Sequence, residues 1–129
     1  MLRLLTRSSL LVLVGVAASC GPEGAAQERD ALASWAATVE AASDHWASGA
    51  LPARFADETL EQVQQHLAGE SQKIDRVKST PDSINGLRQA LAEADRAAAE
   101  ARAALQSGTP AFGRDASARA ARLRSALQR

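Results

Sequence analysis

His45 and His66 are the chain's only histidines, and with carboxylate help two imidazole rings can hold a metal ion such as zinc. The hydrophobic pattern places a turn near residue 50, so His45 comes five residues before the turn and His66 about sixteen after it. At a helical rise of about 1.5 Å per residue, the two rings would lie about 15 Å apart along neighbouring helices. We therefore expect no shared metal site, and two partly exposed histidines beside the apolar faces.

Glu70 is the one charged residue within an otherwise apolar helical stripe. A buried carboxyl group with a raised pKa can serve as a catalytic acid or base. The interpretation we favour is a polar position that fixes helix register, with its charge meeting an arginine or water. Lys73 and His66 stand three and four residues away, so both are within reach on the same helix.

Three further carboxylates, Asp57, Glu58 and Glu61, cluster near the start of one expected helix. Paired carboxylates can cleave glycosidic bonds, but a helix N-terminus favours negative charge for electrostatic reasons alone. The sequence has no Ser/His/Asp or Cys/His pattern, no glycine-rich phosphate loop and no CxxC pair. We expect no catalytic residues, no metal ligands and no cofactor.

Cys20, the only cysteine, follows a short apolar segment at the start of the chain. Arg3 and Arg7 precede this segment, and residues 8–19 carry no charge. That length suits the apolar region of a signal peptide and is too short to span a bilayer, which needs about 20 residues. Small residues lead directly into the cysteine: Ala17, Ala18 and Ser19.

Residues 1–24 thus resemble the lipobox signal of bacterial lipoproteins, although Ala17 stands where that family prefers leucine. The resemblance implies removal of residues 1–19, a diacylglycerol on the Cys20 thiol, and an acyl chain such as palmitate on the new amino group. Two or more chains anchor a protein stably. In that family an aspartate after the cysteine favours the inner membrane, so Gly21 implies the outer membrane, with the protein facing the periplasm.

The remaining chain has a helix-forming composition. It contains no Tyr, two Phe and two Trp, and it is rich in Ala, Leu, Arg, Glu and Gln, which favour helices. We expect one all-α domain over residues 28–129, joined to Cys20 by a tether that ends at residue 27. With Cys20 modified, no cysteine would remain for a disulfide.

Four segments repeat apolar residues at alternating spacings of three and four. The first three are 28–48, 52–79 and a segment that begins with Thr80-Pro81 and ends at Gly108. The fourth begins its regular part near Asp115. Short loops between such segments predict an antiparallel bundle of coiled-coil type, with three long helices and a shorter C-terminal helix.

Turns near residues 50 and 80 set the register of this bundle. The first turn brings Trp35 level with Leu67, and the second brings Leu67 level with Ala94. Large side chains then face small ones, as a close-packed core requires. We expect Trp35 and Trp46 to be largely buried.

The charge is unevenly distributed along the chain. Residues 20–100 carry seven basic and fourteen acidic side chains, whereas residues 101–129 carry six arginines and one acid, Asp115. The last segment therefore either docks on its own acidic domain, which we favour, or binds an anionic partner. Its candidate interaction residues are Arg114, Arg119, Arg122, Arg124 and Arg129. Nucleic acid is not expected, because the chain is exported and residues 114–129 contain no aromatic side chain to stack on bases.

These features together suggest a non-enzymatic, lipid-anchored bundle in the bacterial cell envelope. We expect it to act as a scaffold or assembly factor through contact with an envelope protein. The alternative is a surface-interaction protein whose basic C-terminal helix binds anionic lipid, lipopolysaccharide or cell wall.

Overall fold

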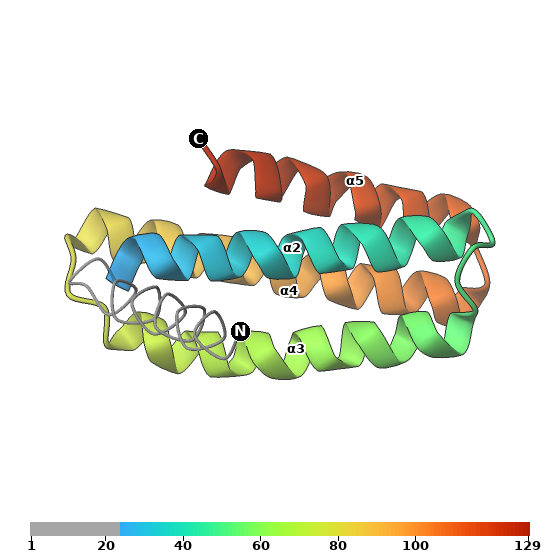
Figure 1. Ribbon diagram of the computed structural model, residues 1–129, viewed down its shortest axis with the longest axis horizontal. Coiled ribbons are helices and arrows are strands. Elements are labelled where there is room, and N and C mark those ends of the chain that lie inside the picture. The colour runs from blue at the N-terminus through green and yellow to red at the C-terminus, as the bar shows by residue number, and fades with distance from the viewer. Residues whose placement is uncertain (1–23) are drawn as a thin grey trace, which may run out of the picture.

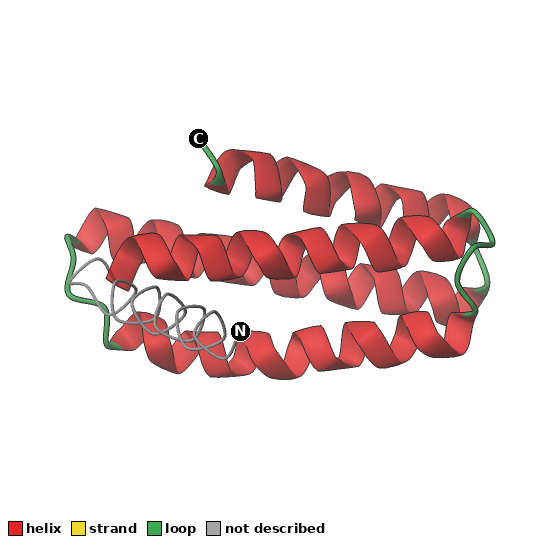
Figure 2. Ribbon diagram, viewed as in Figure 1, coloured by secondary structure: helices red, strands yellow, loops and turns green. Residues whose placement is uncertain are grey.

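The computed structural model describes residues 24–129, which form four α-helices in an antiparallel bundle (Figures 1 and 2). The helices are α2 (Gly24–Ala47), α3 (Ala53–Asp75), α4 (Pro81–Ser107) and α5 (Pro110–Leu127). The predicted all-α bundle of three long helices and a shorter C-terminal one is confirmed. Within the described residues, no helix has the length and apolar character needed to cross a membrane. The expected signal peptide, Cys20 and Gly21 lie outside the described residues.

Local sequence signals set both ends of α4. Thr80 caps α4, because its side-chain oxygen accepts a hydrogen bond from the Ser83 backbone N–H at 3.2 Å. Gly108 ends α4 with a left-handed φ of 64°, a conformation that glycine adopts without strain. At the other end of the chain, α2 begins at Gly24, so residues 24–27 of the expected tether are helical.

The start of α5 differs from the expectation that regular structure begins near Asp115. The helix begins at Pro110, and Gly113 lies within it and is buried. A side chain at Gly113 would meet the Trp46 ring, with a Cβ only 2.7 Å from one ring carbon. Gly113 is therefore a packing position that lets Trp46 lie against α5, and it does not interrupt the helix.

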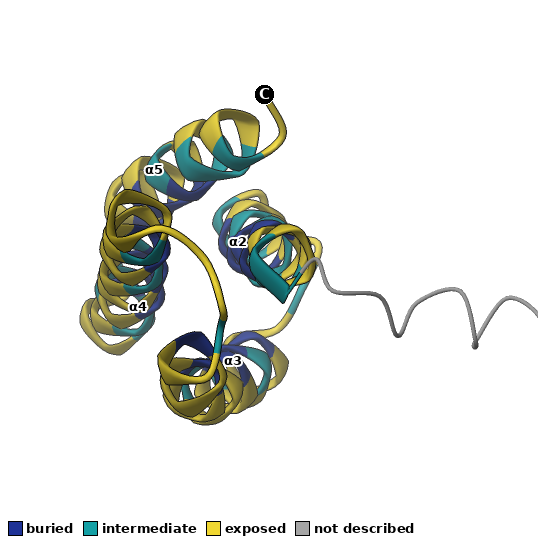
Figure 3. Cartoon of the chain, turned by 90° about the vertical axis from the view of Figure 1, so that its left-hand side faces the viewer, coloured by how far each residue is buried: buried dark blue, intermediate teal, exposed yellow. Residues whose placement is uncertain are grey.

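The helices form a rhombus when the bundle is viewed along its axis (Figure 3). α2 and α4 contact each other and both remaining helices, whereas α3 and α5 lie at opposite corners and do not touch. We call the end that carries Gly24 and the 76–80 loop the proximal end (Figure 1). The distal end carries the α2–α3 and α4–α5 loops.

The core combines large side chains from α3 with small ones from α4, as predicted. The buried apolar residues of α3 are mostly large (Leu60, Val63, Leu67 and Ile74), whereas those of α4 are mostly alanine (Ala90, Ala94, Ala97, Ala98, Ala101 and Ala104). Alanines also line the α2–α5 contact, including Ala116 and Ala120 of α5. Small side chains let the helix axes approach closely, and the large ones fill the space between them.

The expectation that both tryptophans are largely buried is met only in part. Trp35 and Trp46 are only partly buried, and the innermost positions of α2 are taken by Leu32, Ala36 and Val39. Trp35 lies at the edge of the α2–α3 seam, where its indole N–H hydrogen-bonds Glu70. A tryptophan N–H needs such a polar partner, which keeps the ring at the border of an apolar core.

Candidate functional site

α5 docks along α2 and α4 of its own domain. Its half-buried leucines, Leu123 and Leu127, pack against the core. Arg124 binds the Glu40 carboxylate through Nε and Nη2, at 2.8 and 3.3 Å. Arg119 pairs with Glu100 at 3.2 Å. These contacts favour the first of the two roles expected for this helix.

The other three predicted arginines are placed differently. Arg114, Arg122 and Arg129 are exposed, and none of them forms an ion pair within residues 24–129. The spacing of eight residues places Arg114 and Arg122 on one side of α5, about 12 Å apart, and Arg129 follows two residues after the helix ends at Leu127. We call these three side chains the arginine face.

Glu70 lies in a polar cluster between α2 and α3. It is 5% exposed, and Lys73 donates a hydrogen bond to its Oε1 at 3.3 Å. The Trp35 indole and the Glu28 carboxyl group also hydrogen-bond it. His66, four residues before Glu70, stacks on the Trp35 ring with centroids 4.4 Å apart. The expected register-setting role fits this arrangement, with a lysine in place of the expected arginine.

Glu28 was missed in the sequence because it stands at the limit of the expected first helix. It lies four residues before Leu32, which is fully buried, so the same periodicity places it on the buried face. The periodicity of the sequence therefore indicates that Glu28 faces the core, but only for a helix that extends back to Gly24.

The two carboxyl groups have opposite pKa shifts. Burial, together with the hydrogen bond and charge of Glu70, raises the pKa of Glu28 from 4.5 to about 7, and Lys73 partly opposes this. Burial also disfavours the charged form of Glu70, but hydrogen bonds from Glu28, Lys73 and Trp35 outweigh it and lower the pKa of Glu70. One buried oxygen of each group, Oε2, lacks a donor when both are ionised. Protonation of Glu28 supplies a donor to the pair.

The remaining candidate residues are separate from this cluster. Asp57 accepts a hydrogen bond from Arg102 at 3.0 Å, which ties α3 to α4, while Glu58 pairs with Arg54 at 3.4 Å. His45 is exposed near the end of α2, away from His66 on α3. Across residues 24–129, no three His, Cys, Asp or Glu side chains come together in a way that could hold a metal ion.

Two exposed phenylalanines mark the distal end of the bundle. Phe55 and Phe112 are 55% and 57% exposed, and they lie in the first turns of α3 and α5. Phe112 lines a groove of about 530 Å³ between α4 and α5, together with Ala103 and Ala104. Phe55 and Phe112 are the chain's only phenylalanines, and neither belongs to the apolar stripe of its helix. Their positions in the sequence therefore already indicated exposed rings.

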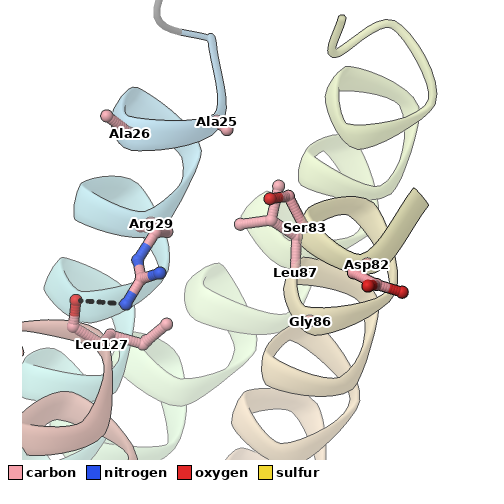
Figure 4. A pocket seen from close by; sticks show the side chains of 8 residues that line it. All are labelled: Ala25, Ala26, Arg29, Asp82, Ser83, Gly86, Leu87 and Leu127. Carbon is pink, nitrogen blue, oxygen red and sulfur yellow. Dashed lines mark hydrogen bonds between the residues drawn. The ribbon is translucent and has the colours of Figure 1, made fainter. Parts of the chain in front are cut away.

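A notch opens toward the proximal end, where α5 stops at Leu127 (Figure 4). It measures about 510 Å³ and is bordered by α2, α4 and the end of α5. Arg29 lies on one side of it, opposite α4, and its guanidinium donates a hydrogen bond to the Leu127 carbonyl at 3.4 Å (Figure 4). The lining is mixed: Ala25, Ala26, Arg29, Asp82, Ser83, Gly86, Leu87 and Leu127.

Comparisons with protein-family models, curated proteins and solved structures found no match to this chain. The chemistry and geometry of the molecule itself are therefore the basis for assigning a function.

Proposed function

We propose that this protein is a lipid-anchored helical bundle of the bacterial cell envelope that acts as a scaffold or assembly factor through protein–protein contact. Cys20 carries the lipid, and the bundle faces the periplasm, at the outer membrane. The support for this anchor is the lipobox-like run that ends at Cys20. In this proposal the protein is not an enzyme, and its polar side chains serve to join helices or to meet partners.

The observation that carries the contact function is the exposure of both phenylalanines at the distal end. α2 has 24 residues, so these rings lie about 36 Å along the bundle from Gly24. Aromatic side chains are enriched in protein interfaces, where burying one ring stabilises the complex strongly. The bundle would thus present its apolar contact residues at the end farthest from the anchor.

The groove beside Phe112 has the composition of a contact site. Ala103 and Ala104 form an apolar floor, and the Arg119–Glu100 ion pair lies at its edge. An apolar centre with a polar rim is the usual anatomy of a protein interface. We therefore expect the partner to insert an apolar side chain next to Phe112.

Site-specific crosslinking in intact cells tests this proposal. A photoreactive phenylalanine analogue is placed at Phe55 or Phe112, and at the exposed Gln72 on α3 as the control. We expect one discrete crosslinked envelope protein from the distal positions and none from Gln72. Identical products from all three positions, or none from the distal ones, would contradict a distal contact surface.

Substitution gives the matching loss of function. Phe55→Ser with Phe112→Ser should abolish partner capture and leave the melting temperature nearly unchanged, because both rings are more than half exposed. Gln72→Ser with Gln89→Ser, two exposed positions toward the proximal end, should retain capture.

A further inference from the structure

α5 is the only net-positive helix among the four described. It carries four arginines and one aspartate, whereas acids outnumber bases by three in α2, by three in α3 and by one in α4. Acids of α2 and α4 neutralise only two of these arginines, Arg124 and Arg119. The arginine face therefore remains as a basic strip on an otherwise acidic domain.

The residues around the arginine face are small, apart from one acid. Ala118 and Ser125 are exposed on the same side of α5, and so is Asp115, seven residues before Arg122. A protein interface of high affinity usually needs a buried aromatic or aliphatic anchor, which this strip lacks. Exposed guanidinium groups instead suit an array of phosphate groups, with which arginine forms charge-assisted hydrogen bonds.

We propose that the arginine face binds the anionic head groups of the membrane surface and lays the bundle along it. This inference rests on the lipid anchor of the proposed function, since a basic patch adds a second, reversible attachment to a lipid chain. α5 runs back toward the proximal end, so Arg129 lies toward the end that carries Gly24 (Figure 1). Anchor and arginine face can then engage one membrane together.

The charge of the opposite side fixes which side turns toward the lipid. α3 lies at the corner opposite α5 and is net negative (Figure 3). The same anionic surface would repel it. Rotation of the bundle about its long axis is therefore biased, with α5 toward the membrane and α3 away from it.

Arginine footprinting on the lipid-anchored protein, purified from bacterial membranes and reconstituted into vesicles, tests this orientation. Phenylglyoxal modification is followed by peptide mass spectrometry in phosphatidylcholine vesicles with and without phosphatidylglycerol. An arginine near an anionic surface gains about 1 kcal/mol, so modification of Arg114, Arg122 and Arg129 should slow about fivefold with phosphatidylglycerol. Arg54 and Arg76, which are exposed on and just after α3, are internal controls and should not change. High salt should remove the difference.

Each alternative leaves its own footprint. A bundle standing on its proximal end would protect Arg76 and Arg129 but not Arg114, and this result would overturn the proposal. Equal modification rates in both kinds of vesicle would also overturn the proposed orientation. Co-flotation of the protein with neutral vesicles would in that case still support the lipid anchor. Failure of that co-flotation would instead contradict the proposed function. Protection by a soluble acidic protein but not by vesicles would reassign the arginine face to a protein partner.

Discussion

Glu28 and Glu70 bring two carboxyl groups into one helix seam, next to Trp35 and Lys73. Two buried carboxyl groups in contact cannot both ionise without cost, so the pair retains a proton at a pH where an isolated glutamate would have lost it. The cluster links α2 to α3 near the proximal end. At the residue scale, the seam is therefore expected to be pH-sensitive.

The sign of this sensitivity follows from the raised pKa of Glu28. Folding favours the protonated form of Glu28. The contribution of Glu28 to the free energy of unfolding is therefore complete below pH 4.5, and it is lost as pH rises through about 7. Glu28→Gln, which is always neutral, should raise the free energy of unfolding at pH 8 by about 1–2 kcal/mol. At pH 5 it should change little.

Thermal melting at both pH values checks this, with Asp30→Asn as the control because Asp30 is an exposed neighbour on α2. A Glu28→Gln variant that is less stable than wild type at pH 8 would show that the pair holds no shared proton.

Gly113 gives a second residue-scale prediction. Gly113→Ala would place a Cβ 2.7 Å from the Trp46 ring, and overpacking of this kind costs about 1–3 kcal/mol. That cost outweighs the gain of about 1 kcal/mol in helix propensity, so the variant should melt at a lower temperature. Gly69→Ala is the matched control, because open space surrounds Gly69 in α3, and it should melt at a higher temperature. A stabilised Gly113→Ala would mean that Trp46 is free to move away.

At the scale of elements, α5 is held to the bundle by two unlike sets of contacts. Leu123 and Leu127 pack on the core, while Arg119 and Arg124 form partly exposed ion pairs. Exposed pairs contribute little, about 0–1 kcal/mol each, whereas a fully buried leucine contributes about 1.5–3 kcal/mol. The leucines should therefore decide whether α5 stays docked.

Replacing both leucines tests this division. Leu123→Ser with Leu127→Ser should lower the free energy of unfolding by about 2 kcal/mol or more, even with every arginine kept. Arg114→Gln with Arg122→Gln should leave chemical denaturation curves unchanged, because these side chains form no ion pair in the described bundle. Equal stability of the leucine variant and wild type would contradict docking through the leucines.

At the scale of the whole molecule, the sequence predicted what depends on nearby residues. Spacings of three and four identified the helices, and Thr80-Pro81 and Gly108 marked the ends of α4. Three features that depend on distant residues were missed. Gly113 lies within α5 and leaves room for Trp46 of α2, and Glu28 acquires its role only when α3 brings Glu70 beside it. Which arginines of the C-terminal segment form ion pairs likewise depends on the positions of Glu40 and Glu100.

We propose above all that a lipid on Cys20 fixes this bundle to the envelope. Intact-mass spectrometry of the protein from bacterial membranes tests it most directly. We expect a chain that starts at residue 20 and carries the mass of a diacylglycerol with a further acyl chain, and we expect Cys20→Ser to remain uncleaved and without lipid. An unmodified Cys20, or normal cleavage and membrane retention of Cys20→Ser, would contradict the account.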